Sequence, residues 1–235
     1  AKVIRYGKKQ GPQKQKDYEY EIDRIVKNFS EFSVWHQNKI LAKFKTSLLG
    51  EHQIENLCAG IAMAHENKIN LKTIQETVKE FKGVKRRLEI RAEIKKIKVI
   101  DDLAHSPSKA RGSLGSLRVY FPKAKIFAVF EPNVGNRIIN SKNLYQNTFN
   151  QANFTIIPRL SKTKTKPGQE KRMNGQELAQ IIQQKNKETK VLYLENDQEV
   201  IKFLSSQPRQ NDIIVFLGSH GFRKMIEETI TCLRQ

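Results

Sequence analysis

From residue 84 onward the chain alternates short apolar segments with helical segments, and this alternation restricts the folds that it can adopt. Strands are predicted for the apolar segments at residues 88–93, 98–102, 126–130, 154–157, 191–194 and 213–217. Repeated strand–helix units with short apolar strands are typical of a mainly parallel sheet that helices cover on both faces. We therefore predict an α/β fold for this part of the chain.

Capping residues mark where several helices begin. Ser106 and Pro107 predict one start, with serine as the N-cap and proline at the first helical position. Asn174 and Glu177 have the spacing of a capping box and predict a second start. Further helices are predicted at residues 144–152, after Asn196 with Glu199, and at residues 225–233.

The first 83 residues follow a different pattern. Strands are predicted at residues 2–6, at 18–26 and within 29–44, with a polar loop at residues 7–16. The sequence then turns helical, and Asn70 is predicted as the N-cap of a helix with apolar residues on one face. Gly83 is predicted to close this helix. We therefore place a domain boundary between residues 83 and 84.

Composition limits the partners of this chain. Its formal net charge of +19 favours anionic partners such as nucleic acid, acidic lipid or phosphorylated small molecules, although lysines on a solvated surface produce the same charge. No RRM, KH or helix-turn-helix signature occurs, so nucleic acid is the weaker choice. No apolar run approaches the ~20 residues of a membrane helix, and we expect no membrane partner.

Ligands of parallel sheets gather where the strands end. Four segments follow predicted strands in this way, at residues 101–107, 131–137, 158–172 and 218–222. In the first of them Asp101 and Asp102 can accept ribose hydroxyls, and His105 can contact an anion or transfer a proton. The alternative is that one of the aspartates only fixes the turn.

The other segments give weaker signals. Arg137 is a candidate carboxylate binder, and the glycines of residues 218–222 allow backbone N–H groups to approach a ligand. The lysine-rich residues 159–172 indicate either a solvated loop or a phosphate contact. Residues 50–56 can hold a ligand at the start of a helix, or they can merely cap that helix. Residues 83–89 can clamp a phosphate, or they can form a solvated cluster of charges.

Taken together and in this order, these segments resemble the motifs of the Mur ligase family. The residues that carry the resemblance are Gly50-Glu51-His52-Gln53 with Asn56, then Phe81, Gly83, Arg86, Arg87 and Glu89, then Asp101-Asp102-x-Ala104-His105-x-Pro107, and finally Glu131-Pro132. The resemblance implies that residues 1–83 are the C-terminal part of the central ATPase domain. It also implies that residues 84–235 are the C-terminal substrate- and nucleotide-binding domain, with a Rossmann-like sheet.

Within that family, four details resemble the murein-peptide ligases: Gly50-Glu51-His52, residues 86–91, Glu131-Pro132 and Gly221-Phe222. This resemblance implies a role in cytoplasmic peptidoglycan recycling. ATP and Mg²⁺ would activate the carboxylate of UDP-N-acetylmuramate as an acyl phosphate, which the amine of the murein tripeptide L-Ala-γ-D-Glu-meso-diaminopimelate would attack. The ligases that add L-alanine to UDP-N-acetylmuramate are the nearest alternative, although Val134 stands where they have an arginine.

The resemblance also implies roles for individual residues. His52 and Asn56 would lie near the adenine, Arg87 near the nucleotide phosphates and ribose, and Asp102 at the ribose hydroxyls. The residues that would face the incoming amino acid or peptide are His105, Ser106, Arg137, Gly218, Ser219, His220, Gly221 and Phe222. Gln53 replaces the usual asparagine, which would alter the adenine contact, and Ser106 replaces a frequent second histidine.

Several motifs are missing from the 235 residues. There is no G-x-x-x-x-G-K-[ST] phosphate loop, no dinucleotide fingerprint, no Ser-His-Asp or Cys-His arrangement and no zinc spacing. The two cysteines lie far apart in predicted helices, which fits reduced thiols in the cytoplasm.

In the Mur family the phosphate loop, the Mg²⁺ ligands and the muramate-binding domain precede the region that this chain resembles, and the chain starts with alanine rather than methionine. We therefore expect it to be part of a longer ligase and not to turn over by itself. Detectable ATP-dependent ligation by residues 1–235 would contradict this expectation. A non-catalytic Mur-like regulator and a nucleic-acid-binding module are the other hypotheses.

Overall fold

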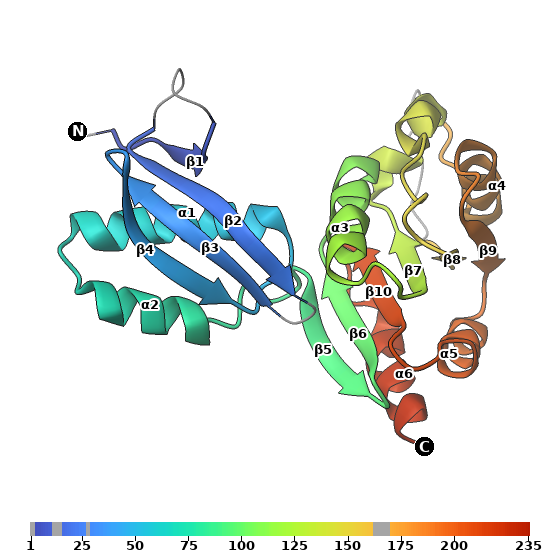
Figure 1. Cartoon of the computed structure of the whole chain (residues 1–235). Coiled ribbons are helices and arrows are strands. Elements are labelled where there is room, and N and C mark those ends of the chain that lie inside the picture. The colour runs from blue at the N-terminus through green and yellow to red at the C-terminus, as the bar shows by residue number, and fades with distance from the viewer. Residues whose placement is uncertain (1–2, 11–15, 27–28, 162–169) are drawn as a thin grey trace. The chain divides into compact units, whose positions relative to one another are not determined.

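The computed structural model describes residues 3–10, 16–26, 29–161 and 170–235 (Figure 1). The chain forms two compact units. Unit 1 contains residues 1–83 together with 119–121, and unit 2 contains residues 84–118 and 122–235. None of the helices in the described ranges has the length and apolar character that a membrane span requires.

Unit 1 contains a four-stranded sheet in the order β1-β2-β3-β4. The strands are β1 (Tyr6–Lys8), β2 (Tyr18–Val26), β3 (Phe29–His36) and β4 (Lys39–Thr46). β1 runs parallel to β2, and the other neighbours are antiparallel. The first strand lies later than the predicted residues 2–6, because Tyr6 pairs with Tyr18 and the pairing then fixes the register. Within the predicted loop, residues 11–15 lie outside the described ranges.

Two helices, α1 (Glu51–Glu66) and α2 (Leu71–Glu80), pack against this sheet (Figure 1). Alternate residues of a strand and every third or fourth residue of a helix share a face, so the apolar residues of both layers meet. The side chains buried in this core are Tyr18, Tyr20, Phe32, Val34, Phe44, Ile54, Cys58, Ile61, Ala62, Ile74 and Val78. Full burial of a large apolar side chain contributes about 1.5–3 kcal/mol to stability.

α2 begins as predicted, because the Asn70 side chain accepts a hydrogen bond from the backbone N–H of Lys72. Its end differs from the prediction. The helix stops at Glu80 and the next residue is extended. Gly83 lies farther along with φ 88°, and a Cβ at this position would lie 2.8 Å from Leu48 Cδ2. Glycine is therefore needed here for a left-handed backbone and a close contact, not for capping the helix.

Unit 2 contains a six-stranded sheet in the order β5-β6-β10-β7-β8-β9. The strands are β5 (Glu89–Ile94), β6 (Ile97–Asp102), β7 (Ile126–Glu131), β8 (Phe154–Pro158), β9 (Lys190–Leu194) and β10 (Ile213–Gly218). β5 is antiparallel to β6, and all other neighbours are parallel. The predicted mainly parallel α/β fold is confirmed.

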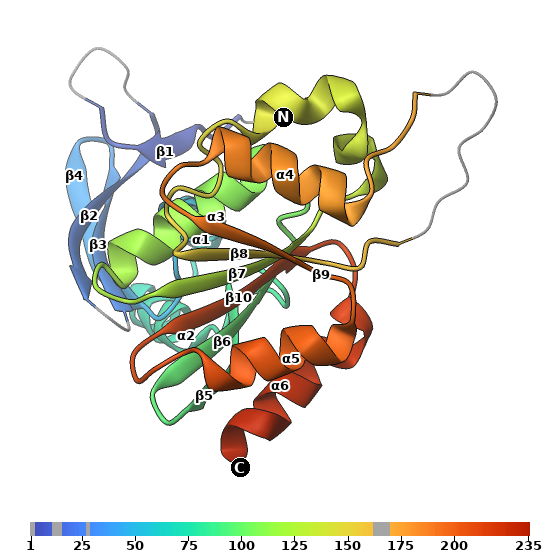
Figure 2. The ribbon, with the colours of Figure 1, turned by 90° about the vertical axis from the view of Figure 1, so that its right-hand side faces the viewer.

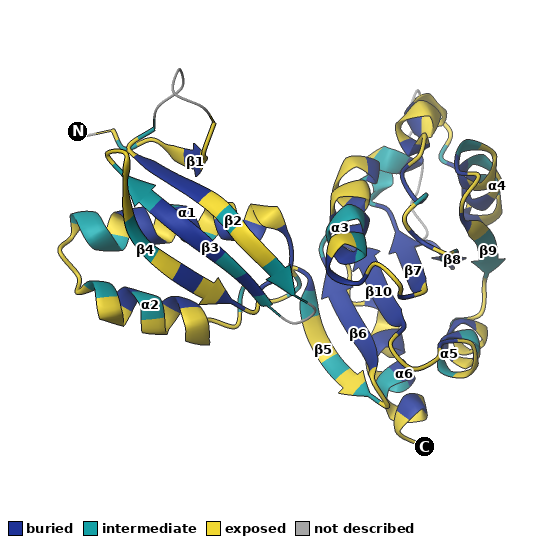
Figure 3. Ribbon diagram, viewed as in Figure 1, coloured by how far each residue is buried: buried dark blue, intermediate teal, exposed yellow. Residues whose placement is uncertain are grey.

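Helices cover both faces of this sheet. α3 (Pro107–Tyr120) and α4 (Gly175–Lys185) lie on one face, and α5 (Asp197–Ser206) and α6 (Met225–Arg234) lie on the other (Figure 2). As a result, every residue of β6, β7 and β10 is buried (Figure 3). Burial on both faces explains why β7 and β10 read as nearly continuous apolar runs in the sequence.

The helix starts of unit 2 follow the sequence signals. The Asn174 side chain accepts from the N–H of Glu177, and the Glu177 carboxylate accepts from the N–H of Asn174, so the predicted capping box is confirmed. Asn196 caps α5 through the N–H of Gln198. The Ser106 carbonyl accepts the N–H of Ala110 at the start of α3.

The helix predicted at residues 144–152 is wrong. A 3-10 helix runs over Ile139–Tyr145, and turns follow it. Asn147 has φ 56°, which interrupts a right-handed helix. The buried Asn186 then takes the place of helical partners, because its Oδ1 accepts from the N–H of Phe149 and its Nδ2 donates to the Tyr145 carbonyl. A side chain from the end of α4 thus decides this conformation.

Candidate functional site

The segments after β6, β10, β7 and β8 emerge at one edge of the unit 2 sheet, because these four strands are parallel. The strand order places the residues that follow Asp102, Gly218, Glu131 and Pro158 successively along this edge, which we call the carboxyl edge. Most of the predicted substrate-facing residues meet here, although they are far apart in the sequence. Parallel α/β sheets bind their ligands at this edge.

Arg86 connects two of these segments. Its Nε donates to Asp101 Oδ2 at 3.1 Å, and its Nη1 donates to the Ser219 carbonyl at 3.1 Å. Its Nη2 donates to the carbonyls of Gly218 and His220 at 2.9 and 2.8 Å. The sequence indicated a phosphate clamp or a solvated charge for this arginine. The structure instead directs its guanidinium at the protein, where it holds the turn after β10 against the end of β6.

Asp102, the predicted ribose contact, is buried with both carboxylate oxygens in use. Oδ2 accepts the N–H of Leu88 at 2.8 Å, and Oδ1 accepts the N–H of Ala104 at 2.7 Å. Burial raises the pKa of Asp102, and these two hydrogen bonds counteract that rise. The alternative role, in which this carboxylate fixes the turn, is the arrangement in the structure. A ribose contact would have to share these oxygens.

His105 is half-buried beside the start of α3. Its Nδ1 lies 2.7 Å from the Leu103 carbonyl. A carbonyl only accepts, so Nδ1 carries the hydrogen, and Nε2 of the neutral ring is left with a lone pair. The His105 carbonyl accepts the N–H of Asn133 at 3.1 Å, which joins this segment to the one after β7. Ser106 lies next to His105, with its Oγ 3.3 Å from Ser108 Oγ.

The predicted nucleotide-binding residues are divided between the two units. His52 and Asn56 are exposed on unit 1, four residues apart on α1 and therefore on one helix face. Gly50 is the N-cap of that helix, so neither side chain stands at the capping position. Gln53 is only 5% exposed and faces the interior of unit 1, whereas His52 and Asn56 are exposed.

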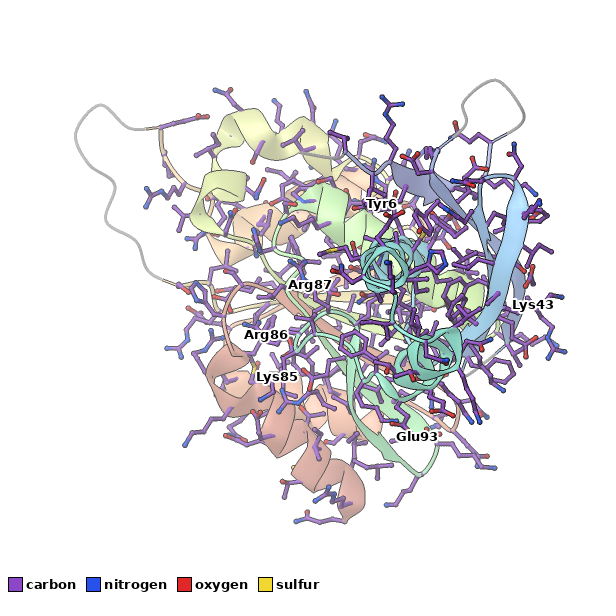
Figure 4. All side chains as sticks on the ribbon, turned by 90° about the vertical axis from the view of Figure 1, so that its left-hand side faces the viewer. Tyr6, Lys43, Lys85, Arg86, Arg87 and Glu93 are labelled. Carbon is purple, nitrogen blue, oxygen red and sulfur yellow. The ribbon has the colours of Figure 1, made fainter. Side chains whose placement is uncertain are left out.

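Arg87 belongs to unit 2 and is exposed. Figure 4 labels it together with Lys85 and Arg86 in the segment before β5. Burial raises the pKa of Asp102, and the charge of Arg87 opposes this rise, so these two predicted nucleotide-binding residues lie near each other. Of these cations, Arg86 donates to carbonyls of the turn after β10.

Arg137 lies at the end of a 3-10 helix (Val134–Arg137) that follows β7, and it is 6% exposed. Its Nη1 donates to the Ser161 carbonyl at 2.9 Å, whereas its Nε has no hydrogen-bond partner in the described ranges. Burial lowers the pKa of Arg137, and the charge of Glu131 opposes that effect. A buried guanidinium with an unused donor is suited to an anionic ligand.

A second network crosses the carboxyl edge and was not predicted. Arg223 donates from Nε and Nη2 to the two oxygens of Asp197, at 2.8 and 2.9 Å, and from Nη1 to Glu131 at 3.1 Å. Arg223 holds the pKa of Asp197 below its usual range. The backbone of residues 222–224 has positive φ, and such strain in non-glycine residues gathers at functional sites. In the sequence, the Gly221-Phe222 motif drew attention to this turn, but it did not indicate which residues Arg223 would pair with.

A cavity of about 490 Å³ opens at the carboxyl edge. Its walls are formed by Arg159, Leu160, Ser161, His220, Phe222 and Arg223. Two arginines and a histidine line it together with apolar side chains, and no carboxylate is among these six residues. The cavity therefore suits a ligand that has an anionic group and an apolar portion.

The two glycines of the turn after β10 have different roles. A Cβ at Gly218 would lie 2.7 Å from Phe222 Cζ and 3.0 Å from the Glu131 carbonyl oxygen, whereas a Cβ at Gly221 would meet nothing within 4 Å. Gly218→Ala should therefore destabilise unit 2 by about 1–3 kcal/mol, and Gly221→Ala should change stability by less than about 0.5 kcal/mol. Urea denaturation checks this pair, and equal effects of the two substitutions would refute the packing role of Gly218.

Known proteins are similar to this chain in sequence and in fold. The sequence profile described as "Mur ligase, glutamate ligase domain" matches residues 86–220. The UDP-N-acetylmuramate–L-alanine ligase of Brachyspira hyodysenteriae is 28% identical over 217 residues, which are 91% of this chain and 46% of that protein. The chain spans under half the length of the curated relatives that it matches.

Two solved structures show the same fold. The UDP-N-acetylmuramate–alanine ligase of Thermotoga maritima superposes with a TM-score of 0.77 at 20% identity, over 97% of this chain and 47% of that one. A murein peptide ligase of Psychrobacter arcticus superposes with a TM-score of 0.59 at 22% identity, over 99% of this chain and 46% of that one. Because the profile match covers more than half of the 235 residues, this chain belongs to the Mur ligase family.

Proposed function

We propose that this chain is the substrate- and nucleotide-binding part of an ATP-dependent amide ligase. The ligase would join the murein tripeptide L-Ala-γ-D-Glu-meso-diaminopimelate to UDP-N-acetylmuramate in the cytoplasm, during peptidoglycan recycling. Residues 1–83 would be the tail of its ATPase domain, and residues 84–235 its C-terminal domain. Family membership supports the class of reaction.

The observation that carries the proposal is the cation-lined cavity at the carboxyl edge of unit 2. Its volume of about 490 Å³ falls within the roughly 300–1,000 Å³ of pockets that hold drug-sized ligands. A free alanine would fill little of it, whereas a peptide has the length and the carboxylates to contact its arginines. The buried Arg137 beside it also has no hydrogen-bond partner for its Nε among the residues that the structure describes.

The ligation needs the acceptor amine as a neutral nucleophile. Its nitrogen would attack the acyl carbon, the carbon–oxygen bond to phosphate would break, and the amine would lose a proton. We assign that proton to His105 Nε2, and the hydrogen bond from Nδ1 to the Leu103 carbonyl, which fixes the tautomer, supports this assignment. The turn after β10 lies along the same edge and would help to position the acceptor.

Nucleotide and metal enter the proposal on different grounds. His52, Asn56, Arg87 and Asp102 remain the proposed ATP contacts, and Arg87 offers the bidentate donors that phosphate groups accept. For Mg²⁺, no group of three or more His, Cys, Asp or Glu side chains within the described ranges has the arrangement of a metal site. The described residues thus give no Mg²⁺ site, and we derive no step through the metal.

Two alternatives each have an observation in their favour. The relatives that match this chain are named UDP-N-acetylmuramate–L-alanine ligases, which supports L-alanine as the acceptor. The net charge of +19 supports a nucleic-acid-binding module. An L-alanine ligase would use the same carboxyl edge, whereas a nucleic-acid-binding module would not require this edge.

Titration of ¹⁵N-labelled residues 1–235 at about 0.15 M salt separates these functions. We expect the tripeptide to shift the amide resonances of residues 131–137 and 218–223, and L-alanine to bind at least about tenfold more weakly. Comparable binding of L-alanine would favour the alanine ligase. No response to either ligand, together with salt-sensitive binding of single-stranded DNA, would contradict the proposal and favour the nucleic-acid module.

A further inference from the structure

Arg159 lies between two cavities at the carboxyl edge. It is the first residue after β8, and its side chain is 53% exposed. On one side it lines the cavity of about 490 Å³ together with His220 and Arg223. On the other side it lines a cavity of about 600 Å³ together with Glu195 and Asp197. An arginine in this position can reach a ligand in the first cavity without any rearrangement of the backbone.

Asp197, the ionic partner of Arg159, already pairs with Arg223. Asp197 accepts both Nε and Nη2 of Arg223 at 2.8 and 2.9 Å, which is a bidentate pair. Arg159 adds only a long contact, with its Nη2 3.4 Å from Asp197 Oδ2. The guanidinium of Arg159 can therefore turn to a ligand carboxylate while Asp197 keeps its partner.

The ionic network of Arg137, Arg159, Arg223, Glu131 and Asp197 beside the smaller cavity has a positive surplus. Arg137, Arg159 and Arg223 contribute three guanidinium groups, and Glu131 and Asp197 contribute two carboxylates. Nε of the buried Arg137 also has no acceptor in the described part of the chain. One further carboxylate would balance the charge in this partly desolvated site.

We propose that Arg159 determines acceptor specificity by binding a carboxylate that lies away from the reacting amine. This inference rests on the proposed ligase function and deepens it. The favoured acceptors are peptides with a distal carboxylate, and an amino acid such as L-alanine lacks that group. Leu160 and Phe222 provide an apolar wall for the methylene groups between the amine and the carboxylate.

The test compares Arg159→Gln and Arg159→Lys with the parent chain of 235 residues, using the murein tripeptide, L-alanine and glutarate as probes in NMR titrations. Arg159→Gln should weaken tripeptide binding about tenfold, equivalent to about 1.4 kcal/mol, and leave the Kd of L-alanine unchanged. Arg159→Lys should lie in between, since it keeps the charge and loses the paired donors. Arg234→Gln, at an exposed position of α6, is the control for the loss of one charge.

Glutarate separates this inference from the proposed function. If the parent chain binds glutarate but not the tripeptide, the proposed function fails. Binding of a carboxylate by Arg159 then stands only if Arg159→Gln abolishes glutarate binding, and its role in acceptor specificity falls with the proposed function. If Arg159→Gln binds the tripeptide and glutarate within about twofold of the parent, or weakens L-alanine equally, the specificity role is overturned. Absence of glutarate and tripeptide binding in the parent chain overturns it as well.

Discussion

Replacing Arg86 with methionine is expected to lower the free energy of unfolding of unit 2 by about 3 kcal/mol, which is the cost of removing one partner of a buried ion pair. Asp101 is 1% exposed, and among the described residues the substitution would leave its charge with a single ionic contact, at 3.4 Å to Arg91. The carbonyls of residues 218–220 would lose their shared donor as well. The turn after β10 should then become mobile.

Native-state hydrogen exchange measures this loss in β7 and β10, whose amides report the opening of unit 2. Lys85→Met is the matched control, because Lys85 is exposed in the same segment. It should change stability by less than about 0.5 kcal/mol. If Arg86→Met were no more destabilising than Lys85→Met, the hydrogen bonds of Arg86 to the turn would contribute nothing to stability.

Replacing Arg223 with methionine should cost about 2 kcal/mol at neutral pH, because two carboxylates lose charge-assisted hydrogen bonds. Glu131 is 2% exposed and would keep the hydrogen bond from the Ser161 hydroxyl and the charge of Arg137. Asp197 would lose its bidentate partner. The substitution should therefore loosen the junction between the end of β7 and the start of α5.

The pH dependence of this loss has a definite sign. Arg223 lowers the pKa of Asp197 in the folded chain, so the pair stabilises the fold when the pH is above the ordinary aspartate value of about 3.9. The contribution of Asp197 disappears as the pH falls through its depressed folded-state pKa. Urea denaturation of the parent and the variant between acidic and neutral pH should show their stability difference shrinking toward low pH.

Lys224→Met is the control for this substitution, since Lys224 also has a left-handed backbone and its side chain is exposed. A stability difference between Arg223→Met and the parent that stays constant down to low pH would contradict the ionic role. An equal loss in Lys224→Met would assign the effect to the strained backbone instead of the guanidinium.

Local patterns in the sequence determined most of the secondary structure. β7 and β10 are apolar up to their last residues, Glu131 and Gly218, and burial on both faces of a parallel sheet favours that pattern. The capping box at Asn174 is also local, because its partner Glu177 is three residues away. These elements follow from interactions within one segment. The order of the Mur ligase motifs along the chain then indicated the domain to which the elements belong.

Local patterns failed where a distant side chain decided the conformation. The apolar spacing at residues 144–152 fits a helix, yet Asn186 supplies other hydrogen-bond partners and turns form instead. At the end of α2, Gly83 serves a contact with Leu48, which its position after a helix could not indicate. In both places the tertiary contact outweighed the local propensity.

The candidate site divides in the same way. The sequence by itself determined which segments meet at the carboxyl edge, because parallel strands end on the same side of their sheet. Only the tertiary structure decided the hydrogen bonds of Arg86 to the turn after β10 and of Arg223 to Glu131, whose partners lie more than 130 and 90 residues away in the chain. Hydrogen bonds of this kind depend on distances of a few tenths of an ångström between segments, and those distances arise only after the sheet has formed.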